Sequence, residues 1–208
     1  MTDIQAIKNE LIKYGKRAGE KNFTPGTSGN MSARLNDKIL ITTSGSANEY
    51  LEDDEIVLID FCGNLIEGSK RPSSEKMLHI EYYKQRPDIN YILHMHTPCL
   101  SAFASCGMAL DEPVMPENVF YFGQIPLAEY GLPSSNDLVE KTAKYFKEYN
   151  VIMMANHGMV SAGKTLKEAY LNLELAESYA QVILNTKILG GAVLLNEQQV
   201  EEINSLKK

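Results

Sequence analysis

The first twenty residues place apolar side chains three or four positions apart, which is the spacing of one helix face. Residues 4–22 are therefore predicted to form an amphipathic helix, with Asp3 as its N-cap. Pro25, Gly26 and Gly29 follow closely, so the chain is expected to leave the helix for a loop. The apolar positions of the helix are Ile4, Ile7, Leu11, Ile12 and Tyr14.

Short runs of β-branched and aromatic residues, separated by turn residues, predict the strands. Residues 31–35 and 38–44 are expected to form one hairpin, and residues 56–68 a second hairpin that turns at "CGN". The other predicted strands are residues 90–97, residues 118–130, and residues 150–163 with a turn at 156–158; residues 105–115 are predicted to be loop.

Four later stretches have helical spacing. Ser73 or Ser74 is expected to cap the first of them, and Pro87 to end it. The predicted helices are residues 73–87, 134–149, 165–191 and 196–208. Because strands and helices mix without a strict βαβ alternation, and the early strands form hairpins, the pattern predicts an α/β fold rich in antiparallel pairs. Residues 1–208 are expected to form a single domain.

The composition limits the classes of function that this protein could have. The chain has 208 residues, of which 44% are hydrophobic, and a formal net charge of −7. A chain of this length can bury a core without disulfides or a structural metal, so any metal site needs a functional reason. The negative charge argues against nucleic acid as the main partner, but local donors could still hold one anionic small molecule.

The three cysteines, Cys62, Cys99 and Cys106, form no CxxC pair and leave an odd count. Together with the absence of a signal-like segment and of an apolar run of membrane length, this predicts a reducing, cytoplasmic location. The cysteines are expected to be ordinary core residues.

Two histidines lie two residues apart in the apolar stretch "YILHMHTPCL". In a strand, residues i and i+2 point to the same face, so His94 and His96 could both reach one ion. Such a pair can also be satisfied by hydrogen bonds alone. His157, which precedes Gly158 after another predicted strand, would complete a three-histidine site with an open position. His79 has charged neighbours and is expected at the surface or behind the ligands.

Three stretches rich in glycine and hydroxyl residues could bind an anion: "GTSGN", "TTSGS" and "PSSE", at residues 26–30, 42–46 and 72–75. The third opens a predicted helix, where free N–H groups favour an anion. For each stretch alone, a turn or a helix cap is the favoured explanation, and none has a P-loop or dinucleotide pattern. Glu75 is either an ordinary first-turn glutamate or a carboxylate beside the metal that moves protons.

Five motifs, "GTSGNMS", "TTSG", "RPSSE", "HMHT" and "ANHG", occur in this order and at spacings that resemble the class II aldolase/adducin family. The resemblance covers about residues 5 to 195. It implies a three-layer α/β/α sandwich with a central mixed, mostly antiparallel sheet. It also implies a cytoplasmic homotetramer with active sites at subunit interfaces.

The family's functional residues carry over to matching positions. His94, His96 and His157 match its three zinc-binding histidines, and Glu75 matches its catalytic acid/base and joins them as a candidate metal ligand. Its phosphate-binding pairs match Gly29 and Asn30, Ser44 and Gly45, and Ser73 and Ser74.

The match is incomplete after the HxH strand. Tyr121 is a candidate for a catalytic tyrosine of the family, and Glu117 lies where a dehydratase branch has its acid/base. Residues 196–208 contain no tyrosine, although the family's aldolases supply one from a mobile tail.

The resemblance implies a zinc-dependent aldolase that cleaves L-fuculose 1-phosphate or a similar sugar 1-phosphate into dihydroxyacetone phosphate and an aldehyde. One Zn2+ per subunit is expected, with other divalent metals as alternatives. The glutamate at position 75 favours the aldolases, because the family's epimerases carry aspartate there. A related sugar-phosphate dehydratase or 4-epimerase is the alternative, and an adducin-like module without metal is a more distant one.

Overall fold

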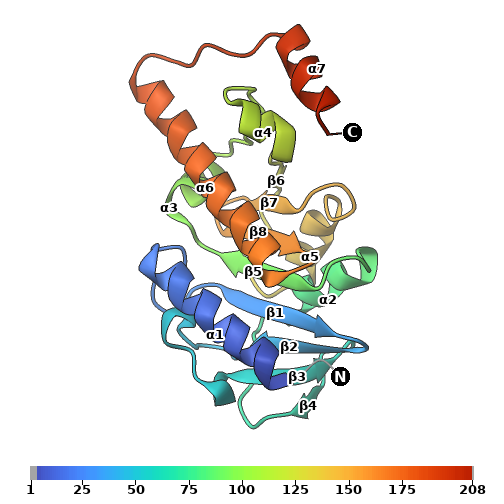
Figure 1. Cartoon of the computed structure of the whole chain (residues 1–208). Coiled ribbons are helices and arrows are strands. Elements are labelled where there is room, and N and C mark those ends of the chain that lie inside the picture. The colour runs from blue at the N-terminus through green and yellow to red at the C-terminus, as the bar shows by residue number, and fades with distance from the viewer. Residues whose placement is uncertain (1–3, 208) are drawn as a thin grey trace.

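The computed structural model describes residues 4–207, so the predicted cap Asp3 lies outside the described residues. An eight-stranded sheet forms the centre (Figure 1). Its strands are β1 (Asn30–Leu35), β2 (Lys38–Thr42), β3 (Ile56–Asp60), β4 (Leu65–Glu67), β5 (Tyr91–Met95), β6 (Leu127–Ala128), β7 (Val151–Met154) and β8 (Gly158–Gly163). The helices are α1 (Ile4–Glu20), α2 (Lys76–Gln85), α3 (Pro98–Ser105), α4 (Pro116–Tyr121), α5 (Asn136–Ala143), α6 (Leu166–Ile188) and α7 (Glu197–Ser205), with short 3-10 turns η1 (Asn48–Tyr50) and η2 (Asp53–Glu55).

The sheet is mixed and mostly antiparallel, as predicted. The strand order is β4-β3-β2-β1-β5-β8-β7-β6. Every neighbouring pair is antiparallel except β6 and β7, which run parallel. The three predicted hairpins β1–β2, β3–β4 and β7–β8 are all present. Because β1 and β5 are adjacent although far apart in sequence, the loop before β1 lies beside the histidine strand.

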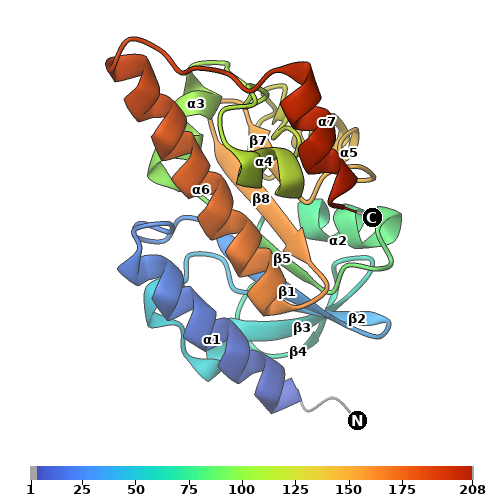
Figure 2. The same cartoon turned by 45° about the horizontal axis from the view of Figure 1, so that its top comes forward.

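Helices cover both faces of the sheet, which gives the expected three layers. Helices α1, α3 and α6 pack on one face, and α2 and α5 on the other (Figures 1 and 2). Alternation along β5 assigns Leu93 and Met95 to the core under α1, α3 and α6, and Ile92 to the core under α2 and α5. His94 therefore faces the α2 layer.

The predicted strand over residues 118–130 is wrong over most of its length. Helix α4 occupies Pro116–Tyr121, and only Leu127–Ala128 pair as a strand. Pro116 stands in the first turn of α4, a position where proline needs no N–H partner. Helix α7 packs on α4 (Figure 2), and Lys207 Nζ donates to the Val119 carbonyl at 2.7 Å, so tertiary contacts override the β-propensity of "NVFYF".

Helix α3 was not predicted from sequence. It begins with Pro98, and its free N–H groups at Cys99 and Leu100 donate to the Glu177 carboxylate of α6 at 2.7 and 2.9 Å. A carboxylate at a helix N-terminus is favoured by both hydrogen bonding and the helix dipole. The cap comes from a residue distant in sequence, so no local motif announces it.

Two smaller expectations are also corrected. Glu75, rather than Ser73 or Ser74, is the N-cap residue of α2, and its side chain makes no capping bond. The Ser73 hydroxyl accepts instead from the Glu75 N–H at 3.2 Å, within the loop that precedes the helix. The cysteines are not core residues: Cys62 and Cys106 are exposed, and Cys99 is partly buried.

Within residues 4–207, the structure contains no helix that combines the length and apolar character needed to span a membrane.

Candidate functional site

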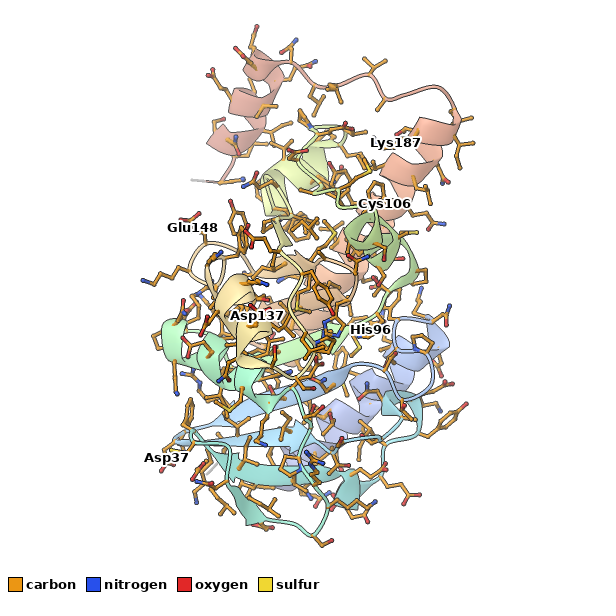
Figure 3. All side chains as sticks on the ribbon, turned by 180° about the vertical axis from the view of Figure 1, so that it is seen from behind. Asp37, His96, Cys106, Asp137, Glu148 and Lys187 are labelled. Atoms are coloured by element: carbon orange, nitrogen blue, oxygen red, sulfur yellow. The ribbon has the colours of Figure 1, made fainter. Side chains whose placement is uncertain are left out.

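Three histidines from two segments of the chain lie close together at the ends of β5 and β7. His94 lies in β5, His96 follows the last residue of that strand, and His157 lies in the turn between β7 and β8. One ring nitrogen from each lies within 4.8 Å of the others, and the ring centroids are 4.8 to 5.1 Å apart. Figure 3 labels His96 near the centre of the molecule. The predicted convergence is therefore present in the structure.

Backbone contacts hold these rings in place. His94 Nδ1 donates to the Met159 carbonyl at 2.9 Å, which leaves His94 Nε2 directed toward His96 Nε2, 3.1 Å away. A Cβ atom at Gly158 would lie 2.6 Å from the Met95 carbonyl oxygen and 2.8 Å from the His96 ring. Position 158 therefore needs glycine because β5 and the His96 ring pass too close for any side chain.

Glu75 completes the cluster from the start of α2. Its buried carboxylate lies with Oε2 at 3.1 Å from His94 Nε2 and Oε1 at 3.5 Å from His157 Nε2. Asn30 Nδ2 donates to the same Oε2 at 3.1 Å. A carboxylate and three imidazoles thus share one small buried space.

The charges of this cluster are strongly coupled. Burial opposes ionisation of Glu75, but attraction to His94 and His157 and the hydrogen bonds from His94 and Asn30 together outweigh burial and hold the Glu75 pKa well below its usual range. Burial likewise opposes charging of His94, yet the Glu75 carboxylate raises the His94 pKa. Burial and repulsion from His94 lower the pKa of His96 to about 3 and that of His157 to about 4. Two of the three imidazoles are therefore neutral at physiological pH.

This donor set suits a divalent metal ion. Neutral imidazole nitrogen and carboxylate oxygen are ligands that zinc prefers, and ligands of a tetrahedral zinc ion lie roughly 3.4 Å apart for bonds of about 2.1 Å. The 3.1 Å separation of the His94 and His96 nitrogens is close to that value. The His94–Met159 bond resembles the outer hydrogen bonds that fix metal-binding histidines. The residues present therefore fit a metal.

A polar network lies behind Glu75. His79 is fully buried, so its expected surface position is wrong, whereas the alternative position behind the ligands agrees with the structure. Its Nε2 donates to Asn30 Oδ1 at 2.5 Å, and its Nδ1 pairs with Ser32 Oγ at 2.7 Å. Tyr83 OH lies 2.8 Å from Ser32 Oγ. Burial and repulsion from His94 lower the His79 pKa to about 3, so the ring is neutral.

Ser32 and Tyr83 were missed by sequence reasoning, because both are common residue types in plain secondary structure. One available signal for Tyr83 was its spacing from His79, since residues four apart share a helix face.

Two of the predicted anion-binding stretches lie side by side. The Ser44 N–H donates to the Arg71 carbonyl, and the Ser73 N–H donates to the Thr42 carbonyl, at 2.9 and 3.0 Å. Ser44, Gly45 and Ser74 are exposed, whereas Ser73 is buried. Ser74 Oγ accepts from Ser134 Oγ at 2.9 Å.

The third stretch approaches the histidine strand directly. Gly29 has φ +74°, and a Cβ there would lie 2.5 Å from the His94 carbonyl oxygen. Asn30 follows and faces Glu75. The structure therefore brings parts of all three stretches to the neighbourhood of the histidines, and phosphate binding stays a prediction.

Tyr121 and Glu117 both lie on α4 and are exposed. Tyr121 lines a pocket with Gln124, Tyr149 and Asn150. Among residues 4–207, neither side chain has a hydrogen bond or ion pair with Glu75 or the three histidines, and their catalytic role stays a prediction.

Known proteins are similar in sequence to this chain over most of its length. A relative from Methanocaldococcus jannaschii, named L-fuculose phosphate aldolase, is 36% identical over 85% of this chain and 95% of its own. A Bacillus thuringiensis relative, named 5-deoxy-D-ribulose 1-phosphate aldolase, is 30% identical over 96% of this chain and 94% of its own. A Haemophilus influenzae relative, named 3-oxo-tetronate 4-phosphate decarboxylase, is 34% identical over 88% of both chains.

The fold is also similar to that of a solved protein. A solved structure named L-fuculose 1-phosphate aldolase superposes with a TM-score of 0.90 at 30% identity, over 99% of this chain and 97% of its own. The family described as "Class II Aldolase and Adducin N-terminal domain" matches residues 9–184. The chain therefore belongs to the class II aldolase and adducin family.

Proposed function

We propose that this protein is a zinc-dependent aldolase that cleaves a ketose 1-phosphate into dihydroxyacetone phosphate and an aldehyde. L-Fuculose 1-phosphate or a similar sugar 1-phosphate is the proposed substrate. One observation supports this most strongly: the buried Glu75 carboxylate faces the His94 and His157 nitrogens. The relatives named as sugar-phosphate aldolases support the same reaction.

His94, His96 and His157 would hold the metal. When bound there, a divalent ion would supply Lewis-acid polarisation of the ketose oxygens. The hydroxyl and N–H groups around Ser44 and Ser73 would hold the phosphate and fix the sugar relative to Glu75.

Glu75 is the proposed proton carrier. When the C3–C4 bond breaks, the C4 hydroxyl gives its proton to the Glu75 carboxylate and becomes the aldehyde, while the bonding electrons remain with C3 as an enediolate. Glu75 delivers the proton to that carbon in cleavage and removes it in condensation. A lysine Schiff base is not required for this route.

Decarboxylation is a second candidate, because the Haemophilus influenzae relative is named for it. Loss of CO2 from a 3-oxo acid also leaves an enolate that needs charge stabilisation and a proton. The same metal ligands and Glu75 could serve that reaction. A dehydratase or 4-epimerase remains the other alternative within the family.

A product assay separates these reactions. The zinc-loaded protein is incubated with L-fuculose 1-phosphate, 5-deoxy-D-ribulose 1-phosphate and 3-oxo-tetronate 4-phosphate. Dihydroxyacetone phosphate is followed by coupled reduction, and CO2 release is followed in parallel. Dihydroxyacetone phosphate from at least one ketose 1-phosphate is the expected result. Decarboxylation of 3-oxo-tetronate 4-phosphate also yields dihydroxyacetone phosphate, so CO2 release from that substrate, with no dihydroxyacetone phosphate from either ketose 1-phosphate, would establish the decarboxylase instead. No product from any of the three substrates would contradict both proposals.

The active enzyme is further proposed to be a cytoplasmic homotetramer with active sites at subunit interfaces. Light scattering after size exclusion would measure its mass, and a monomer with full activity would contradict the assembly.

A further inference from the structure

A chain of four buried polar side chains runs from the Glu75 carboxylate into the protein. It passes through Asn30, His79, Ser32 and Tyr83, with successive separations of 3.1, 2.5, 2.7 and 2.8 Å. Asn30 is 6% exposed, Ser32 and His79 are 0%, and Tyr83 is 1%. Burying a polar group costs free energy unless the group is hydrogen-bonded. Each member of this row therefore depends on its neighbours, and loss of one bond would leave a buried group without its partner.

The donor and the acceptor of each hydrogen bond in this row of side chains follow from the groups at its two ends, Glu75 and Tyr83. The Glu75 carboxylate can only accept, so Asn30 must turn its NH2 group toward Glu75 and its carbonyl toward His79. A neutral His79 then carries its proton on Nε2, and its Nδ1 accepts from the Ser32 hydroxyl. Ser32 in turn accepts from Tyr83, whose alternative acceptor, the Asn90 carbonyl, lies farther away at 3.3 Å. Every adjacent pair then has one donor and one acceptor.

We propose that His79 is a positioning residue: through Asn30 it holds the Glu75 carboxylate in the orientation from which Glu75 moves its proton. This inference rests on the proposed function of Glu75. It also assigns the Asn30 side chain to the carboxylate, which leaves the backbone around Gly29, together with the Ser44 and Ser73 loops, for the phosphate.

The test uses two substitutions of His79 by an amide side chain, each of which keeps one of the two hydrogen bonds of the imidazole ring. In His79→Gln, the amide NH2 lies near the former Nε2 and can still donate to Asn30. In His79→Asn, the shorter amide lies near the former Nδ1, so the bond to Ser32 can persist while the bond to Asn30 is lost. We expect His79→Asn to lower kcat about tenfold, the loss expected for one hydrogen bond to a charged network, with KM and zinc content unchanged. His79→Gln should retain most of the wild-type kcat.

Equal loss of kcat in both variants would show a packing role and overturn the inference. Glu75→Gln, measured alongside, separates the two proposals. If it is inactive while His79→Asn keeps wild-type kcat, only the positioning role fails. If Glu75→Gln itself keeps wild-type kcat, the proposed function of Glu75 fails.

A readout without activity is available in the wild-type protein, with or without zinc. Long-range 15N–1H correlation of the histidine rings reports which nitrogen of His79 carries the proton. The Nε2–H tautomer is expected, with slow proton exchange because the ring is buried. An Nδ1–H tautomer or a charged ring at pH 7 would contradict the chain of bonds, even if both variants failed to fold.

Discussion

Strands β1 and β5 present chemically different side chains to their two faces. Toward α1, α3 and α6 they place Met31, Leu93 and Met95, in an apolar core. Toward α2, β1 places Asn30 and Ser32, and β5 places His94, all buried. Apolar burial stabilises the fold wherever the shapes match, whereas each buried polar group needs a partner in a set place. A concentration of costly polar groups on one side of two central strands therefore indicates a site selected for chemistry.

If the polar face performs the chemistry and the apolar face only supports it, substitutions on the polar face should lower activity, and substitutions on the apolar face should lower stability. The largest effect is expected at the metal ligands. His96→Ala removes one of three imidazoles, so zinc content should fall well below one per subunit and aldolase activity to background. Elemental analysis of the purified variant, together with the dihydroxyacetone phosphate assay, measures both. An active, zinc-free variant would contradict the metal site.

The next largest effect is expected at Glu75. Glu75→Gln keeps the size of the side chain but removes its ability to carry a proton. We expect kcat to fall about 100- to 10,000-fold, the range for loss of a general acid/base, while zinc remains bound. Steady-state kinetics on the protein with verified zinc content measures this. Wild-type turnover in the variant would show that Glu75 moves no proton.

The apolar face should respond in stability instead. Leu93→Ala deletes buried methyl groups one residue before His94, but on the opposite side of β5. We expect unfolding free energy to fall by about 2 to 5 kcal/mol, as for other buried leucines. Zinc content and kcat, measured well below the unfolding midpoint, should stay near wild type. A large loss of kcat with intact stability would mean that both faces serve the chemistry.

The smallest effect is a pH dependence of stability from His79. Its folded pKa of about 3 lies below the ordinary value of 6.5 for the unfolded chain, so the unfolded state binds more protons between these values. The contribution of neutral His79 is complete above pH 6.5 and is lost as pH falls toward 3. Urea unfolding of metal-free wild type and His79→Gln should therefore diverge, by roughly 1 kcal/mol for each pH unit below 6. Parallel pH profiles would show that His79 is not buried as a neutral ring.

The sequence predicted most of the sheet and the histidine site, because both depend on local patterns. The spacing of His94 and His96 and the turn before Gly158 are visible in short stretches. The hairpins can also be recognised from short stretches, since their turns contain glycine or asparagine between β-branched runs.

What could not be predicted depends on contacts between distant residues. Helix α3 is capped by Glu177 of α6, and α4 is stabilised by α7, so neither is evident from its own residues. His79 was expected either at the surface or behind the ligands, because charged residues such as Lys76 and Glu81 lie near it in sequence. Its burial depends on Ser32 and Asn30, which β1 brings from more than forty residues away.

The close approach at Gly158 has a consequence for the engineering of this scaffold. The His96 ring packs against the backbone of Gly158, which has no side chain. The position of this ligand therefore depends partly on a residue that cannot itself bind metal. A design that transplants the three histidines without this glycine would copy the donors but not the space they occupy. Conversely, a single added methyl at position 158 would press on the Met95 carbonyl and the His96 ring, and so would displace a ligand without replacing it.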